Sequence, residues 1–199
     1  MPSHDPALTK IYARRNHSCY GMGLGIIILD DVYPGFPGDV RNASAHGYPI
    51  QYEIAEGVDI KKLVRGEHKG DLLAPVLAAA RKLERMGCRA IAAECGYFAW
   101  FQQEIANAVS VPVFASSLLQ VPLAQTLIGA NKVVGLLVAE GDHLQDRHLT
   151  SVGIRLQSNY VVHGAKDDGK CPQFDSLWTK DLRPETPTAE YPKAAGLSS

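Results

Sequence analysis

The chain has 199 residues, 46% of them hydrophobic, and its 20 basic and 21 acidic side chains give a formal net charge of -1. This length is enough to bury a real core, so we expect one domain, or one domain with a fragment of another. The balanced charge gives no support for a nucleic-acid or membrane-surface partner, and no run approaches the roughly 18–20 apolar residues that span a bilayer.

The N-terminal segment 1–21 is polar and lacks the apolar stretch of a signal peptide. We therefore expect it to be poorly ordered and the protein to be cytoplasmic. The whole chain has four cysteines (Cys19, Cys88, Cys95 and Cys171), which are irregularly spaced and form no CxxC motif. In a reducing compartment this spacing predicts neither a disulfide framework nor a zinc site, so we expect no metal.

Short apolar strands alternate with amphipathic helices between residues 22 and 164. In chain order, the expected strands are 23–29, 48–54, 89–93, 111–115 and 132–139, and the expected helices are 71–86, 97–109, 117–128 and 142–151. Gly87 and Gly129 are expected to end two of these helices. The alternation predicts an α/β fold, a parallel sheet flanked by helices with right-handed crossovers.

Several charged and histidine side chains are interpreted as surface features. Lys61, Lys62 and Arg65 are interpreted as a solvated helix face, and His143 and His148 as surface residues rather than metal ligands. Beyond Gly164 no hydrophobic period continues, so residues 165–199 are expected to form an irregular tail. The predicted organisation is thus an N-terminal segment 1–21, an α/β domain 22–164 and this tail.

Polar side chains follow four of the expected strands: Asp30-Asp31, Glu94-Cys95-Gly96, Ser116-Ser117 and Glu140-Gly141. Ligands of parallel sheets bind outside the carboxyl ends of the strands, so we expect these groups to converge on one cleft. The segment 34–44, PGFPGDVRNAS, follows the first strand and is either a binding loop or a structural loop.

Cys95 is the main candidate for chemistry. It lies between a strand and a helix, and a helix N-terminus lowers the pKa of a thiol, which favours a thiolate that acts as base or nucleophile. Inert packing is the alternative, and it is the preferred interpretation for Cys88. Glu94 is either a site carboxylate or a strand-end charge in solvent. Ser116 and Ser117 either bind a carboxylate or only cap a helix.

Three segments carry a family resemblance: GIIILDDVYPGFPGDVRNAS, AIAAECGYFAWFQQEIANAVSVPVFASSLLQ and VVGLLVAEG. Together they resemble the aspartate/glutamate/hydantoin racemase superfamily, in particular its aspartate/glutamate racemase branch, from about Met22 to Phe174. The resemblance implies two similar α/β lobes with the site between them. It also implies proton transfer without a cofactor, on an amino acid or related carboxylate, by one cysteine from each lobe.

The resemblance assigns roles to single residues. Cys95 matches the first-lobe cysteine, which removes the α-proton as a thiolate. Gly96, Ser116 and Ser117 match positions that hold the substrate carboxylate, and Asp30 and Asn42 fall at the cleft edge. With the strand-end carboxylates added, the predicted substrate-binding set is Asp30, Asn42, Glu94, Gly96, Ser116, Ser117 and Glu140.

The sequence departs from the family near Phe174. It contains no second-lobe Glu-Cys-Thr segment, and Cys171 lacks the strand context of the partner cysteine. We therefore expect a shortened or altered C-terminus and an incomplete second lobe, whose exposed apolar surface favours a homo-oligomer. Two alternatives to racemisation stay open: a catalytically silent ligand-binding relative, and a single-cysteine enzyme like arylmalonate decarboxylase or maleate isomerase.

Overall fold

The structure is a computed structural model that describes residues 17–32, 37–129 and 131–165. The expectations for residues 1–16, for most of the C-terminal tail and for Cys171 lie outside the described residues. None of the helices formed by the described residues is both long enough and apolar enough to cross a membrane.

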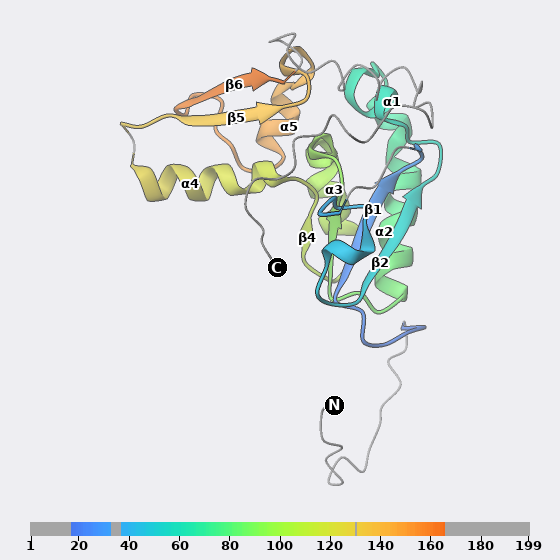
Figure 1. Ribbon diagram of the computed structural model, residues 1–199. Coiled ribbons are helices and arrows are strands. Elements are labelled where there is room, and N and C mark those ends of the chain that lie inside the picture. The colour runs from blue at the N-terminus through green and yellow to red at the C-terminus, as the bar shows by residue number, and fades with distance from the viewer. Residues whose placement is uncertain (1–16, 33–36, 130, 166–199) are drawn as a thin grey trace.

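The larger of two sheets is parallel and contains four strands in the order β2-β1-β3-β4. These strands are β1 (Leu24–Leu29), β2 (Ile50–Ala55), β3 (Ala90–Ala93) and β4 (Val113–Phe114). The helices that accompany it are α1 (Ile60–Arg65), α2 (Leu73–Arg85) and α3 (Gln102–Ala108), and α2 runs alongside the strands (Figure 1). The predicted α/β fold with a parallel sheet flanked by helices is confirmed.

The smaller sheet pairs β5 (Val134–Val138) with β6 (Tyr160–Gly164), again in parallel. It lies with α4 (Gln120–Ile128) and α5 (Asp146–Thr150) to one side of the larger sheet (Figure 1). The sequence did not predict β6, because its short YVVHG segment follows a polar stretch and shows no clear alternation. The expected helix 142–151 is in fact a 3₁₀ turn, η5 (Gly141–His143), followed by the short α5.

The helix expected over 97–109 is also divided. Residues Gly96–Phe101 form a 3₁₀ helix, η3, before α3 begins, and Ser117–Leu119 form a similar turn, η4, before α4. In η3 nearly every side chain is buried, including Tyr97, Phe98 and Phe101. Tertiary packing of these aromatic rings on several sides of one turn overrides the preference for a regular α-helix.

The main core lies between β1, β3 and α2. Ile27, Leu29 and Ile91 pack in one cluster with Val76 and other side chains of α2, Ala80 and Leu83. Gly25 allows this close approach, because a Cβ there would lie 3.0 Å from the Leu83 Cβ and 3.1 Å from the Cys88 Sγ. Cys88 is buried in this cluster, as its interpretation as a packing residue requires.

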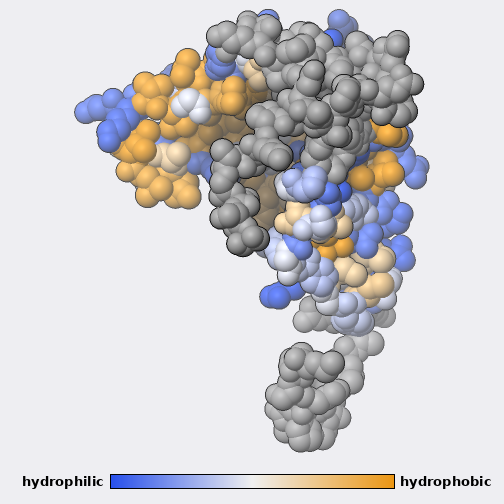
Figure 2. Space-filling view, in the orientation of Figure 1, coloured by the Kyte–Doolittle hydropathy of each residue, from blue (hydrophilic) through white to orange (hydrophobic). Residues whose placement is uncertain are grey.

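A second core cluster lies under the smaller sheet and includes Leu136, Leu149 and Ile154. Large apolar side chains nevertheless remain exposed on this part of the molecule: Leu123, Leu127, Val133, Leu137 and Val161. Figure 2 shows a hydrophobic surface over β5, β6 and α4. Parallel sheets are usually covered on both faces, so within the described residues the smaller sheet lacks part of its usual cover.

Candidate functional site

A cavity of about 420 Å³ opens at the carboxyl ends of β1, β3 and β5. It is lined by four residues of the predicted site, Glu94, Cys95, Gly96 and Ser117. The other residues that line it are Leu29, Asp39, Ile60, Tyr97, Leu118, Leu137, Val138, Ala139 and Leu144. The structure therefore brings the ends of several parallel strands to one cavity, with one thiol among its described lining residues.

The other predicted substrate-binding residues do not line this cavity. The Asp30 carboxylate accepts a hydrogen bond from the Gly57 N–H at 2.8 Å, and the Asn42 side chain caps the short turn Ala43–Ala45. Ser116 is buried and accepts from the Leu118 N–H at 3.1 Å, which makes it the N-cap of η4. Glu140 is buried and forms an ion pair with Arg65.

Cys95 is the residue immediately before η3 and is partly exposed. Burial raises the pKa of its thiol to about 12; the Tyr97 backbone N–H lowers this pKa and the Glu94 charge raises it further. The expectation that a helix N-terminus favours the thiolate is therefore wrong for the protein on its own. The 3₁₀ helix η3 has only six residues, so its dipole is too small to offset the desolvation.

Glu94 is held in the protein rather than facing solvent. One oxygen of its carboxylate accepts from the Leu29 N–H, and the other accepts from the Arg41 guanidinium. Arg41 also donates to the carbonyl oxygens of Asp31, at 2.7 Å, and Leu29. The side chains of Glu94 and Arg41 are only 1% and 12% exposed, so this is a buried ion pair that fastens the loop after β1 to the end of β3.

A second set of contacts joins the two sheets beside the cavity. The Tyr97 hydroxyl donates to the Glu140 carbonyl oxygen at 2.5 Å and accepts from the Glu140 N–H at 3.0 Å. The Glu140 carboxylate receives two hydrogen bonds from Arg65, one of them at 2.8 Å. Lys61, Lys62 and Arg65 are exposed, as their interpretation as a solvated helix face predicts, but the Arg65 guanidinium also pairs with a nearly buried carboxylate.

His148 is fully buried, so its interpretation as a surface residue is wrong. Its ring packs edge-on against Tyr97 and Trp100, with centroids 5.3 and 5.1 Å away. Burial lowers the pKa of His148 to about 4; the Gln145 backbone raises this pKa and the Lys69 charge lowers it. This burial could not be predicted from the sequence around His148, because the aromatic rings that pack on it come from η3, which is distant in the chain.

We expect acid to destabilise the fold through His148. Above pH 6.5, the pKa of an unfolded-state histidine, the ring is neutral in both states and the fold keeps its full stability. As the pH falls from 6.5 towards 4, the unfolded chain takes up a proton that the folded chain does not, so the folded state becomes less stable. The loss should approach about 3 kcal/mol. Denaturant unfolding between pH 7 and 4 measures it. In His148→Phe the free energy of unfolding should depend less on pH between 7 and 4, whereas His68→Gln, at an exposed position, should leave this dependence unchanged.

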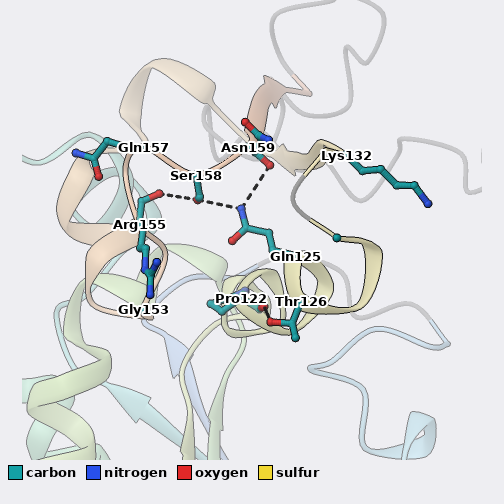
Figure 3. Close-up of a pocket in the computed structure, with 10 residues that line it drawn as sticks. Pro122, Gln125, Thr126, Lys132, Gly153, Arg155, Gln157, Ser158 and Asn159 are labelled. Atoms are coloured by element: carbon teal, nitrogen blue, oxygen red, sulfur yellow. Dashed lines mark hydrogen bonds between the residues drawn. The ribbon is translucent and has the colours of Figure 1, made fainter.

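A larger groove of about 630 Å³ lies between α4 and the segment before β6. In Figure 3, Gln125 on α4 faces Ser158 and Asn159, and its amide nitrogen donates to the Ser158 hydroxyl at 2.9 Å. Arg155 and Lys132 are also on its rim. Among the described residues that line it there is no thiol, histidine or carboxylate, so the smaller cavity at Cys95 is the better candidate for proton-transfer chemistry.

Sequence reasoning missed three residues of the site: Asp39, Arg41 and Tyr97. The first two belong to the irregular segment 34–44, whose position after a strand was a signal for a binding loop. Tyr97 gave no such signal, because a tyrosine at the start of an apolar helix is typical of a core residue. In the described ranges 17–32, 37–129 and 131–165, no three His, Cys, Asp or Glu side chains come together to hold a metal ion.

Comparisons with curated proteins find dimethylsulfoniopropionate lyases. The chain is 32% identical over 162 residues to dimethylsulfoniopropionate lyase 6 of Emiliania huxleyi (strain CCMP1516), which covers 79% of the chain and 42% of that protein. It is 30% identical over 149 residues to dimethylsulfoniopropionate lyase of Durusdinium sp. clade D, covering 72% of the chain and 50% of that protein. The chain thus spans half or less of the length of these relatives.

No protein-family profile matches the chain. Among solved structures, the chain is similar to the crystal structure of an aspartate racemase homologue from Pyrococcus horikoshii OT3. The TM-score is 0.44 at 18% sequence identity, and the alignment covers 78% of the chain and 70% of that structure.

Proposed function

We propose that the chain acts as a lyase on dimethylsulfoniopropionate or a similar β-substituted propionate, with Cys95 as the base and without a cofactor. The observation that carries this proposal is a cavity with one thiol at the strand ends, in a chain whose curated relatives are dimethylsulfoniopropionate lyases. The relatives are longer than the chain, so the activity of the chain itself is part of the proposal.

The chemistry of the elimination fits a single thiol. A base removes a proton from the carbon next to the carboxylate, the electron pair forms a carbon–carbon double bond, and the carbon–sulfur bond breaks. Dimethyl sulfide leaves with the bonding electrons, acrylate remains, and the proton stays on the sulfur of Cys95. Only one face of the substrate needs a proton acceptor, so the reaction asks for no second cysteine.

The positive charge of the substrate would also act on the Cys95 thiol. The pKa of the Cys95 thiol is about 12 because the thiolate is poorly solvated there. A sulfonium cation in the cavity would favour the thiolate, since an opposite charge stabilises the charged form of a nearby acid. Ser117 and the exposed Gly96, which also line the cavity, offer the substrate carboxylate a hydroxyl group and backbone N–H groups.

Racemisation of an amino acid is the second candidate, and the observation that favours it is the sequence resemblance centred on Cys95. It removes the same kind of α-proton, but it must return a proton on the opposite face. The cavity offers one thiol within the described part of the chain. A catalytically silent ligand-binding relative is the third candidate.

One experiment separates these candidates. The purified chain is incubated with dimethylsulfoniopropionate, and dimethyl sulfide is measured by headspace gas chromatography and acrylate by NMR. In parallel, aspartate, glutamate and hydantoins are incubated in deuterated water, and α-proton exchange is followed. We expect dimethyl sulfide and acrylate in equal amounts and no exchange above that of Cys95→Ser. Exchange without dimethyl sulfide would identify a racemase, and neither signal would leave a ligand-binding protein.

A further inference from the structure

The charges around the Cys95 cavity are unbalanced. Its lining contains two carboxylates, Asp39 and Glu94, and no lysine, arginine or histidine among the described residues. The nearest cation in contact with these groups is Arg41, which pairs with Glu94. One guanidinium thus faces two carboxylates, which leaves a formal charge of -1 at the cavity wall.

Arg41 is already committed to other partners. Its guanidinium donates to the Glu94 carboxylate and to the carbonyl oxygens of Leu29 and Asp31. From the described residues, the Asp39 carboxylate receives one hydrogen bond, at 2.7 Å, from the backbone N–H of Arg41 rather than from its side chain. Asp39 therefore keeps an acceptor oxygen for a ligand while Glu94 does not.

The loop that carries Asp39 is held in place. The Asn42 N–H donates to the Asp39 carbonyl oxygen at 2.9 Å, and the Tyr52 hydroxyl on β2 donates to the Val40 carbonyl oxygen at 2.7 Å. Burial raises the pKa of Tyr52, and the Asp39 charge is the second cause. The Asp39 charge is thus fixed at the cavity wall.

Most of the remaining cavity wall is apolar. Leu29, Ile60, Leu137, Val138, Ala139 and Leu144 supply aliphatic surface, which suits the methyl groups of an onium cation better than a primary ammonium group or a second carboxylate. A dicarboxylic amino acid would instead place its side-chain carboxylate beside Asp39, where no described lining residue is cationic. The charges and the walls select the same kind of ligand.

We infer that Asp39 is the counter-ion for the cationic group of the substrate, and that the cavity selects small carboxylates bearing a methylated onium group. This inference deepens the proposed function and rests on it for the identity of the substrate. Asp39 acts by attraction at a distance from the reacting carbon, so it is a specificity residue rather than the base.

The test measures binding rather than turnover. Isothermal titration calorimetry of the purified chain compares the zwitterion 3-(trimethylammonio)propanoate with its carbon isostere 4,4-dimethylpentanoate, in which an uncharged tert-butyl group replaces the onium cation. We expect the onium ligand to bind the wild-type chain more tightly. Asp39→Asn should weaken its binding about 10–100-fold without weakening binding of the isostere. The asparagine retains an oxygen for the Arg41 N–H, so the loop should keep its shape. Asp71→Asn, at an exposed position, is the matched control.

Two results would overturn the inference: equal binding of the cation and the isostere by the wild-type chain, or an unchanged preference for the cation in Asp39→Asn. Circular dichroism and thermal unfolding of each variant show whether a loss of binding reflects a loss of fold. Asp39-dependent binding without release of dimethyl sulfide would contradict the lyase but leave the role of Asp39 intact. If Asp39→Asn released dimethyl sulfide with an unchanged KM, the lyase would be supported and the role of Asp39 would be contradicted.

Discussion

Replacing Cys95 by serine should lower kcat/KM for dimethylsulfoniopropionate by about 10²–10⁴-fold, which is the usual contribution of a general base. A serine hydroxyl is nearly the same size but is far less acidic than a thiol, so it cannot supply the anion. Headspace assays of dimethyl sulfide measure the loss. Cys95 makes few contacts that serine would not, so the thermal unfolding midpoint should change little.

The matched control for this variant is Cys19→Ser. Cys19 is a partly exposed thiol that does not line the cavity, and its replacement should leave the rate unchanged. If Cys95→Ser retained full activity, the role of Cys95 as base would be excluded. Equal losses in both variants would indicate a general effect of thiol removal rather than a specific base.

The pH dependence gives an independent test of the same residue. Since kcat/KM reports the pKa values of the free enzyme, and burial raises the pKa of Cys95 to about 12, the active thiolate should become more abundant throughout the range from pH 7 to 10. We therefore expect kcat/KM to rise with pH over this range without a plateau. A plateau beginning below pH 8 would show that a different group, or a different pKa for Cys95, controls the reaction.

Arg41→Ala should be the most destabilising single change at the site. It removes the guanidinium that pairs with the Glu94 carboxylate, whose side chain is 1% exposed. Breaking a buried ion pair in this way typically costs about 3–5 kcal/mol, because one charge remains buried and unpaired. In a chain of this length such a loss corresponds to a fall of roughly 6–20 °C in the unfolding midpoint, which differential scanning calorimetry measures.

The control for Arg41 is Lys82→Ala, which removes an ion pair with Glu53 from the surface. The Lys82 side chain is 64% exposed, and solvent screens such a surface pair, so its loss should lower stability far less than the loss of Arg41. Adding Glu94→Gln to Arg41→Ala should restore part of the lost stability, because it removes the unpaired charge. Equal effects of Arg41→Ala and Lys82→Ala would contradict the structural role assigned to this pair.

Much of the fold could be predicted from local patterns. The apolar run of β1, the periodic leucines of α2 and the closing Gly87 depend on interactions between neighbouring residues, and the structure contains each of them. The division of 97–109 into η3 and α3 could not be predicted in the same way. It results from the burial of Tyr97, Phe98 and Phe101 against elements that are distant in sequence.

The candidate site could likewise be predicted only in part from local patterns. Cys95 at a strand exit follows from the rule for parallel sheets, which needs only the order of strands and helices. The protonation state of its thiol did not follow, because it depends on how much water the surrounding elements exclude. His148 illustrates the same limit, since a polar helix position became fully buried when aromatic rings from η3 packed on it.

Short-range periodicity and turn residues therefore establish the parallel α/β arrangement and locate Cys95 at the end of β3. The tertiary structure alone decides that Glu94 is paired with Arg41 and that Arg65 holds Glu140. It also decides that the Asp39 carboxylate lines the cavity without a cationic partner among the described residues. Burial and ion pairing depend on contacts between helices, strands and loops that lie far apart in the sequence, so they are decided only when these segments pack together.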